Sequence, residues 1–137
     1  MRRTYIRLGY DFKHQKKVLA GLASPKRVGL CLDTAHAHLA GYDLSTQSGF
    51  EKTMDRIDGL VGIEQIKVIH LNDAKEKLGS HLDRHQHIGR GTIGLEGIRR
   101  IVNFKPFKDT PFILETPKDT DDADKKNLRI VRRLRKE

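Results

Sequence analysis

Residues 66–73 read IKVIHLND, an apolar run that ends in a histidine, an asparagine and an aspartate. Residues 66–71 are predicted to form a strand, and the shorter continuous apolar run at residues 28–32 is typical of a strand that is buried on both faces of a parallel sheet. Two other runs, at residues 28–32 and 112–114, likewise lead into polar stretches, DTAH and ET. Because α/β enzymes build their active sites at the carboxyl ends of parallel strands, this pattern predicts a functional site along one edge of a sheet.

Helical periodicity separates the three predicted strands. Apolar residues recur at helix spacing in residues 11–23, 49–62 and 95–103, and again in the tail from residue 121. Asp11 is predicted to cap the first of these helices, and Ser48 with Glu51 forms a capping-box pattern before the second. The strands lie about 35–45 residues apart, which is the spacing of βα units with enlarged loops.

We therefore expect an α/β fold with about three parallel strands and flanking helices, in a single domain over residues 1–137. A closed barrel of eight βα units needs about 250 residues, so a chain of 137 residues corresponds to part of a barrel. An incomplete barrel has open sheet edges and an uncovered apolar face, which favours association with another chain. The oligomeric state stays open.

The composition favours a polyanionic partner in a reducing compartment. Lys and Arg number 27 against 18 Asp and Glu, which gives a formal charge of +9 and points to nucleic acid ahead of an anionic membrane. The single Cys31 excludes a disulfide framework and is predicted to pack in the core. No apolar stretch approaches the roughly 20 residues of a membrane span, and the N-terminus has no apolar signal region. We expect a cytoplasmic protein.

Imidazoles and carboxylates gather in the polar stretches that follow the apolar runs. Nitrogen and oxygen ligands of these types bind Zn²⁺ or Mn²⁺. Any one of them alone is more often a helix cap or a satisfied polar residue, but their recurrence at equivalent places predicts a shared metal site. The candidate ligands are Asp33, His36, His70, Asp83, His85 and Glu115. The other histidines, His14, His38, His81 and His87, lack such a placement and are assigned to the surface.

Three stretches of the chain resemble one family closely. GLCLDTAHAHLAGYDL (29–44), IKVIHLNDAKEKLGSHLDRHQHIGRGTIGLEGIRRI (66–101) and PFILETPK (111–118) are similar to the C-terminal part of endonuclease IV. This family comprises the zinc-dependent apurinic/apyrimidinic endonucleases of base-excision repair. The resemblance covers residues 9–137, leaves residues 1–8 atypical, and implies the C-terminal portion of a TIM (β/α)₈ barrel.

The resemblance also implies how the metal ligands are divided. Family members carry up to three Zn²⁺ ions; here His36, Asp83 and His85 would hold one ion. A second would be held by Asp33, His70 and Glu115 together with a bridging glutamate that the family carries on an earlier strand. Residues 1–8, MRRTYIRL, contain no acid where that strand should end. We expect an N-terminally truncated member with one complete zinc site, one partial site and impaired activity.

The implied reaction is hydrolysis of the phosphodiester bond on the 5′ side of an abasic nucleotide, which leaves a 3′-hydroxyl. Asp33 and Glu115 would act in catalysis through a metal-bound hydroxide. The partner would be double-stranded DNA with abasic sites, so the protein would associate with the nucleoid during repair. The loop at residues 74–94 supplies candidates for contact with the DNA backbone, namely Lys75, Lys77, Arg84 and Arg90.

Two other classes of protein remain as alternatives. Related TIM barrels include metal-dependent sugar isomerases and epimerases, although a neutral sugar needs no basic surface. The chain would otherwise be a non-catalytic fragment that binds zinc or DNA, in which case DNA binding would depend on salt but not on a chelator.

Overall fold

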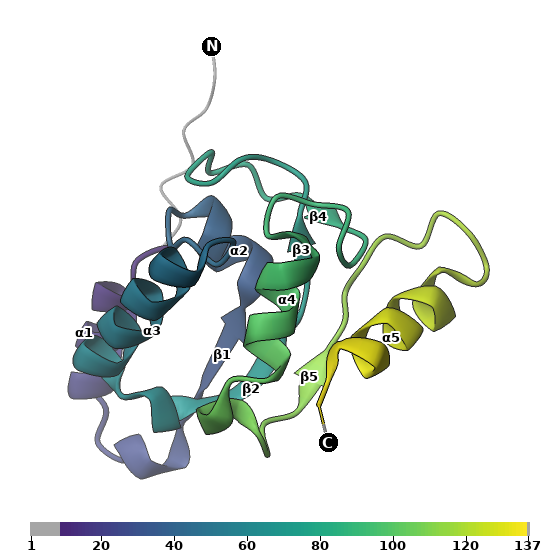
Figure 1. Cartoon of the computed structure of the whole chain (residues 1–137). Helices are drawn as coiled ribbons and strands as arrows, with labels where there is room; N and C mark the ends of the chain where they lie inside the picture. Colours follow the sequence, from purple (N-terminus) through teal and green to yellow (C-terminus); the bar gives the residue numbers. More distant parts are fainter. Residues whose placement is uncertain (1–8, 137) are drawn as a thin grey trace.

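The computed structural model describes residues 9–136, and the predictions for MRRTYIRL fall on residues 1–8, outside that part of the chain (Figure 1). The main elements are α1 (Phe12–Ala20), β1 (Leu30–Asp33), α2 (Thr34–Leu39), α3 (Gln47–Val61), β2 (Ile66–His70), β3 (Asp73–Ala74), β4 (His85–Gln86), α4 (Gly94–Val102), β5 (Phe112–Ile113) and α5 (Ala123–Leu134). Three 3₁₀ turns, η1 (Pro25–Arg27), η2 (Ile63–Gln65) and η3 (Lys105–Phe107), lie between them.

The three predicted strands form one parallel sheet in the order β1-β2-β5. The register places Asp33 beside His70, and His70 beside Ile113. All three carboxyl ends therefore meet at one edge of the sheet. The strands alternate with helices along the chain, as the spacing of βα units predicts.

Within the described part of the chain, helices cover only one face of the sheet. Leu32, Ile69 and Leu71 point to the same side and are at most 3% exposed, and Figure 1 shows α3 and α4 on one side of the sheet, with α5 beside β5. On the opposite face, Cys31 is exposed and Ile113 is 48% exposed. The prediction that residues 28–32 form a strand buried on both faces, with Cys31 in the core, is therefore wrong, because apolar composition does not say which face is covered.

Two helix starts differ from the prediction. A short helix, α2, follows β1 directly, and its N-cap Asp33 accepts a hydrogen bond from the His36 N–H at 2.9 Å. The cap of α3 is Thr46, whose hydroxyl accepts from the Gly49 N–H at 3.0 Å, so Ser48 is not the capping residue. Asp11 caps α1 as predicted, by accepting from the Lys13 N–H.

A buried carboxylate organises the loop between β4 and α4. Asp73 is fully buried, and its two oxygens accept hydrogen bonds from the backbone N–H groups of Ala74, Gly89, Gly91, Ile93 and Gly94. A Cβ at Gly91 would lie 2.3 Å from the Ala74 carbonyl oxygen and 2.4 Å from an Asp73 oxygen. Glycine is therefore required where this loop closes on Asp73.

Residues 9–136 contain no helix that combines the length and the apolar composition of a membrane span.

Replacing Asp73 with alanine should destabilise the fold strongly. The change leaves several buried N–H groups without an acceptor, which should lower the free energy of unfolding by about 3 kcal/mol or more. Urea denaturation followed by circular dichroism would measure the loss. The matched control is Asp55→Ala at an exposed position of α3. Equal stability of the two variants would contradict the role assigned to Asp73.

Acid should destabilise the turn that precedes α3. Burial raises the pKa of Asp43, but hydrogen bonds donated by Ser45 and Thr46 outweigh it and lower this pKa from 3.8 to about 2. Because the folded pKa is depressed, the stabilisation is present above pH 3.8 and is lost as the pH falls towards 2.

Wild-type protein should therefore lose about 1 kcal/mol more than Asp43→Asn between about pH 4 and pH 2, after allowance for solvent screening. Urea titrations at each pH would measure the difference. Asp109→Asn, an exposed site in the loop before β5, is the control and should follow the wild type. A wild type and Asp43→Asn with the same acid profile would contradict the prediction.

Candidate metal centre

The parallel register brings three predicted ligands together at the carboxyl edge of the sheet. Asp33 ends β1, His70 ends β2, and Glu115 follows β5 by two residues. His70 Nδ1 lies 3.0 Å from Glu115 Oε2 and 3.8 Å from Asp33 Oδ2. Because the three positions share one face of the sheet, their donor atoms converge above its end.

The other three predicted ligands approach from outside the sheet. His36 comes from the first turn of α2, whereas Asp83 and His85 come from the segment that enters β4. Asp83 Oδ1 lies 2.7 Å from His36 Nε2 and 3.8 Å from His85 Nε2. The structure thus brings all six candidates to one place, although their role as metal ligands stays a prediction.

Asp33 stands between the two sets. Its Oδ2 lies 3.7 Å from His85 Nε2 as well as near His70. Two groups of donor atoms could each hold an ion, with all atoms of a group within 4.8 Å of one another: Asp33, His36 and His85, and Asp33, His70 and Glu115. The second group has the same three residues as the predicted partial site. The first has Asp33 in place of Asp83, whose Oδ1 lies beside His36 Nε2 and His85 Nε2.

His85 is prepared to act as a metal ligand. Its Nδ1 lies 2.9 Å from the Glu115 carbonyl oxygen, and a carbonyl oxygen only accepts, so Nδ1 carries the proton. In the neutral form of the ring the lone pair is on Nε2, which is buried and makes no hydrogen bond. This nitrogen faces the carboxylates of Asp33 and Asp83. An imidazole held through Nδ1, with Nε2 aimed at carboxylates, is the arrangement that binds a divalent metal ion.

Asn72 connects the ligands and was not among the predicted site residues. Its amide nitrogen donates to Asp33 Oδ2 at 3.2 Å, and its amide oxygen accepts from the Glu115 N–H at 2.8 Å. Thr34 and Asn72 also exchange hydrogen bonds, because the Asn72 N–H donates to the Thr34 hydroxyl and that hydroxyl donates to the Asn72 carbonyl. The only signal in the sequence was an asparagine directly after a strand that ends in a ligand.

One of the four histidines assigned to the surface lies in the core. His38 is 1% exposed, and its Nδ1 accepts from the Leu44 N–H at 3.3 Å. Burial lowers the pKa of His38 below its ordinary value, so its ring is neutral at pH 7. His81 is exposed as predicted, and His14 is half-buried.

His87 ties the metal-site loop to α5 and is only 15% exposed. Asn127 accepts from the Ile88 N–H, so its amide NH₂ faces His87 Nδ1 at 3.0 Å and donates to it. His87 Nε2 therefore carries the proton and donates to Asp119 at 2.9 Å. This hydrogen bond lowers the pKa of Asp119.

The four basic residues predicted to contact DNA all lie exposed on the same loop. The Lys75 N–H donates to the Arg84 carbonyl at 2.9 Å, which brings together the residue after β3 and the residue before β4. Arg84 is 3.5 Å from Glu76, whereas Lys77 and Arg90 show no salt bridge within residues 9–136. Contact with DNA stays a prediction for all four.

A three-stranded parallel sheet with its ligands at the carboxyl edge and helices on one face is part of a TIM barrel. The chain belongs to the xylose isomerase-like TIM barrel family, which it matches over residues 1–136.

Within this family, the chain is similar to proteins named endonuclease 4 or endonuclease IV. The chain is 44% identical over 128 residues to a probable endonuclease 4 of Citrifermentans bemidjiense, which covers 93% of this chain and 45% of the relative. It is 48% identical over 122 residues to a probable endonuclease 4 of Nitrosopumilus maritimus. This match covers 89% of this chain and 44% of that protein. The crystal structure of endonuclease IV from Thermus thermophilus superposes with a TM-score of 0.82 at 38% identity, covering 93% of this chain and 45% of that one. The chain thus spans about 45% of the length of these proteins.

Replacing Asn72 with alanine should weaken metal binding without removing a ligand. Loss of the amide frees the Asp33 carboxylate and the Glu115 backbone, and supporting residues of this kind contribute about 10–100-fold to metal affinity. Zinc titration by calorimetry would measure the change. Asn103→Ala is a matched control, since its side chain bonds backbone groups of α4 and of the end of α5 and none of the candidate ligands. Equal zinc affinity in both variants would contradict the role of Asn72.

Proposed function

We propose that this chain provides a metal centre of a zinc-dependent apurinic/apyrimidinic endonuclease of DNA base-excision repair. The reaction is hydrolysis of the phosphodiester bond 5′ to an abasic site, which leaves a 3′-hydroxyl. The observation that carries the proposal is the grouping of nitrogen and oxygen donors into two sets that share Asp33, with His36 and His85 in one and His70 and Glu115 in the other. Asp83 lies beside the first set, with Oδ1 2.7 Å from His36 Nε2. We assign Zn²⁺ as the ion, with Mn²⁺ as the alternative, because imidazole and carboxylate ligands suit both.

The charge of the site explains why a phosphodiester substrate requires the metal. Three carboxylates, from Asp33, Asp83 and Glu115, face the same region as three histidines. With neutral imidazoles these groups carry three negative charges and repel a phosphate. If each of the two ligand groups held one divalent cation, the net charge would become +1, from two double positive charges and three carboxylates, and the site would attract a phosphate. Zinc also supplies Lewis acidity and lowers the pKa of bound water.

The chain's own residues would orient the substrate and handle its charge. Glu115, whose side chain is 49% exposed, stands at the open side of the site with Oε2 next to His70 Nδ1, where an incoming phosphate would arrive. Asp33 lies deeper, with a 9% exposed side chain, and is fixed by Asn72. We assign these two carboxylates the catalytic roles, and the ligand set Asp33, His36, His70, Asp83, His85 and Glu115 the metal.

The substrate class follows from the basic loop beside the ligands. Lys75, Lys77, Arg84 and Arg90 would contact phosphates on either side of the cleaved bond, which positions a duplex without reading its sequence. An abasic nucleotide leaves the stack at low cost because it has no base to unstack or unpair. Residues 9–136 would act as one unit in this role, in the cytoplasm where the DNA is.

The metal content of the purified protein tests the first part of the proposal. Protein prepared without chelators should contain about one zinc ion or more per chain by plasma mass spectrometry. His85→Ala should retain less, since the unpaired Nε2 is lost. The control is His81→Ala, because His81 is exposed and outside both ligand groups. Less than one zinc per wild-type chain would overturn the assignment.

Cleavage of an abasic duplex tests the reaction. With protein in excess over a duplex that holds one abasic analogue, the full chain should nick the strand on the 5′ side, and chelation should abolish nicking. Glu115→Gln should slow nicking at least about 100-fold. Glu64→Gln, an exposed glutamate at the amino end of β2, should leave it unchanged. Absence of nicking by zinc-loaded protein, or turnover of a keto-sugar in its place, would contradict the proposal.

A further inference from the structure

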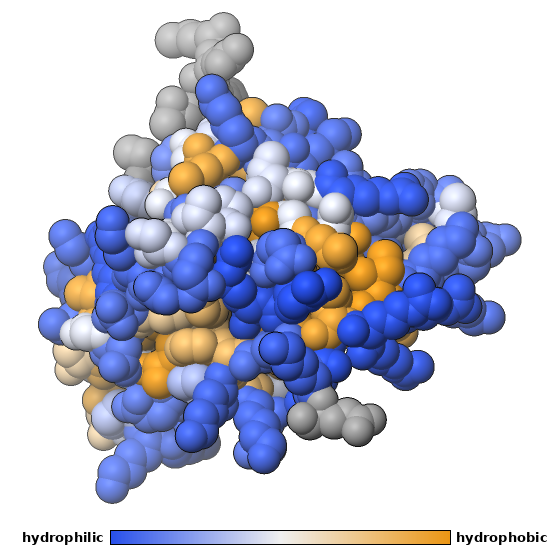
Figure 2. Space-filling view, in the orientation of Figure 1, coloured by the Kyte–Doolittle hydropathy of each residue, from blue (hydrophilic) through white to orange (hydrophobic). Residues whose placement is uncertain are grey.

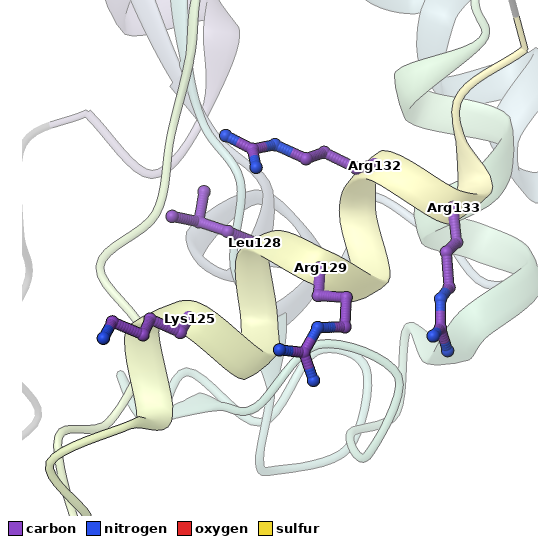
Figure 3. Close-up of a pocket in the computed structure, with 5 residues that line it drawn as sticks. All are labelled: Lys125, Leu128, Arg129, Arg132 and Arg133. Carbon is purple, nitrogen blue, oxygen red and sulfur yellow. The ribbon is translucent and has the colours of Figure 1, made fainter.

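The outer side of α5 carries a row of cations that the metal centre does not use. The helix buries Ala123, Asn127 and Leu134 against the rest of the molecule. Figure 2 shows hydrophilic side chains projecting along the region of α5. In Figure 3, four basic side chains extend from this helix around Leu128, and together they line a hollow of about 550 Å³. We call this set the α5 basic face: Lys125, Arg129, Arg132 and Arg133.

Within residues 9–136, the α5 basic face has no salt-bridge partner, in contrast to other charges nearby. At the start of the same helix, Lys126 pairs with Asp122 at 2.9 Å, and Asp124 pairs with Lys118 at 2.8 Å. Within residues 9–136, no carboxylate lies within salt-bridge distance of any member of the α5 basic face. Among the described residues, no carboxylate competes with an external anion for these four charges.

Helix stability does not require this arrangement. Lys125, Arg129 and Arg133 follow one another at intervals of four residues, and like charges at this spacing destabilise a helix by about 0.2–0.5 kcal/mol per pair. The helix dipole favours cations in the last turn, which accounts for Arg132 and Arg133. It disfavours Lys125, which lies in the first turn.

We propose that the α5 basic face binds the phosphate backbone of duplex DNA, as a second contact surface separate from the metal centre. This proposal rests on the proposed function only in taking DNA as the partner. From Lys125 to Arg133 the helix rises about 12 Å. One DNA strand carries a phosphate about every 3.4 Å along the duplex axis, so the same length presents three to four phosphates. Four cations therefore match the phosphates that they would face.

The chemistry of the face favours nucleic acid over an acidic protein. Leu128 is the only apolar residue among the five that line the hollow, and none of the five is aromatic. Protein interfaces rely on apolar and aromatic cores from which Lys is depleted, whereas DNA interfaces are polar and strongly positive. Three of the four cations are arginines, whose planar guanidinium groups bind phosphate through two hydrogen bonds.

Salt-dependent binding of undamaged duplex tests the proposal. The variant K125Q/R129Q/R132Q/R133Q is compared with K16Q/K17Q/K26Q/K52Q, which removes the same charge from exposed lysines of α1, η1 and α3. Fluorescence anisotropy with chelator present, from about 50 to 200 mM salt, would give the slope of log affinity against log salt. The α5 variant should lose about three units of slope and at least about tenfold in affinity at low salt. The control should lose less than about one unit.

Two further measurements keep the outcome interpretable. R129K/R132K/R133K retains the charges and should keep the wild-type slope. If K125Q/R129Q/R132Q/R133Q loses helix by circular dichroism, the pairs K125Q/R129Q and R132Q/R133Q replace it, and each should lose about half the slope. Equal losses in the α5 and control variants would overturn the proposal, as would binding to phosphatidylserine vesicles or an acidic peptide without binding to duplex.

The test separates this proposal from the proposed function. Binding is measured on undamaged DNA without metal, so it does not depend on the ligand set or on nicking. Nicking with an unchanged α5 slope would overturn the α5 proposal alone. Salt-dependent binding through α5 without nicking would overturn the proposed activity alone.

Discussion

The alignment of the strand ends in the parallel sheet is the constraint on which the rest of the structure depends. Asp33 and His70 are paired in the register of β1 and β2. The reciprocal hydrogen bonds between Thr34 and Asn72 hold the two segments together just after these strands end. A shift by one residue would turn one of these ligands to the helix-covered face. The arrangement of the candidate metal ligands is therefore set by backbone pairing first and by side-chain contacts second.

The regular helices and strands were predictable because the patterns that identify them lie within short stretches of sequence. Continuous apolar runs identified β1, β2 and β5, and helical periodicity identified α1, α3, α4 and α5. The helix α2 escaped prediction because TAHAHL has no apolar stripe and begins at a cap, Asp33, that already counted as a ligand. The β3–β4 pair has two residues in each strand, and it depends on the buried Asp73, whose five N–H partners are spread along the chain to residue 94.

The candidate site was predictable in its residue types but not in its distances. Residues that end strands are brought together by any parallel sheet, so Asp33, His70 and Glu115 could be grouped from order alone. The position of Asp33 between the two ligand groups could not be predicted from the sequence. It depends on how the loop that carries His85 folds back over the sheet. The burial of His38 and the exposure of Cys31 were missed for a related reason: both depend on which surfaces other segments cover.

The dual contacts of Asp33 have a consequence for how variants of this site should be interpreted. Oδ1 caps α2 through the His36 N–H, whereas Oδ2 faces His70 and His85. A single substitution at this position acts as two: it removes a donor atom and loosens the helix that presents His36. Loss of function after such a change would not show whether the lost donor atom or the loosened helix α2 was the cause. Glu115 caps none of the helices in residues 9–136, so a change there is the more informative genetic probe of the candidate centre.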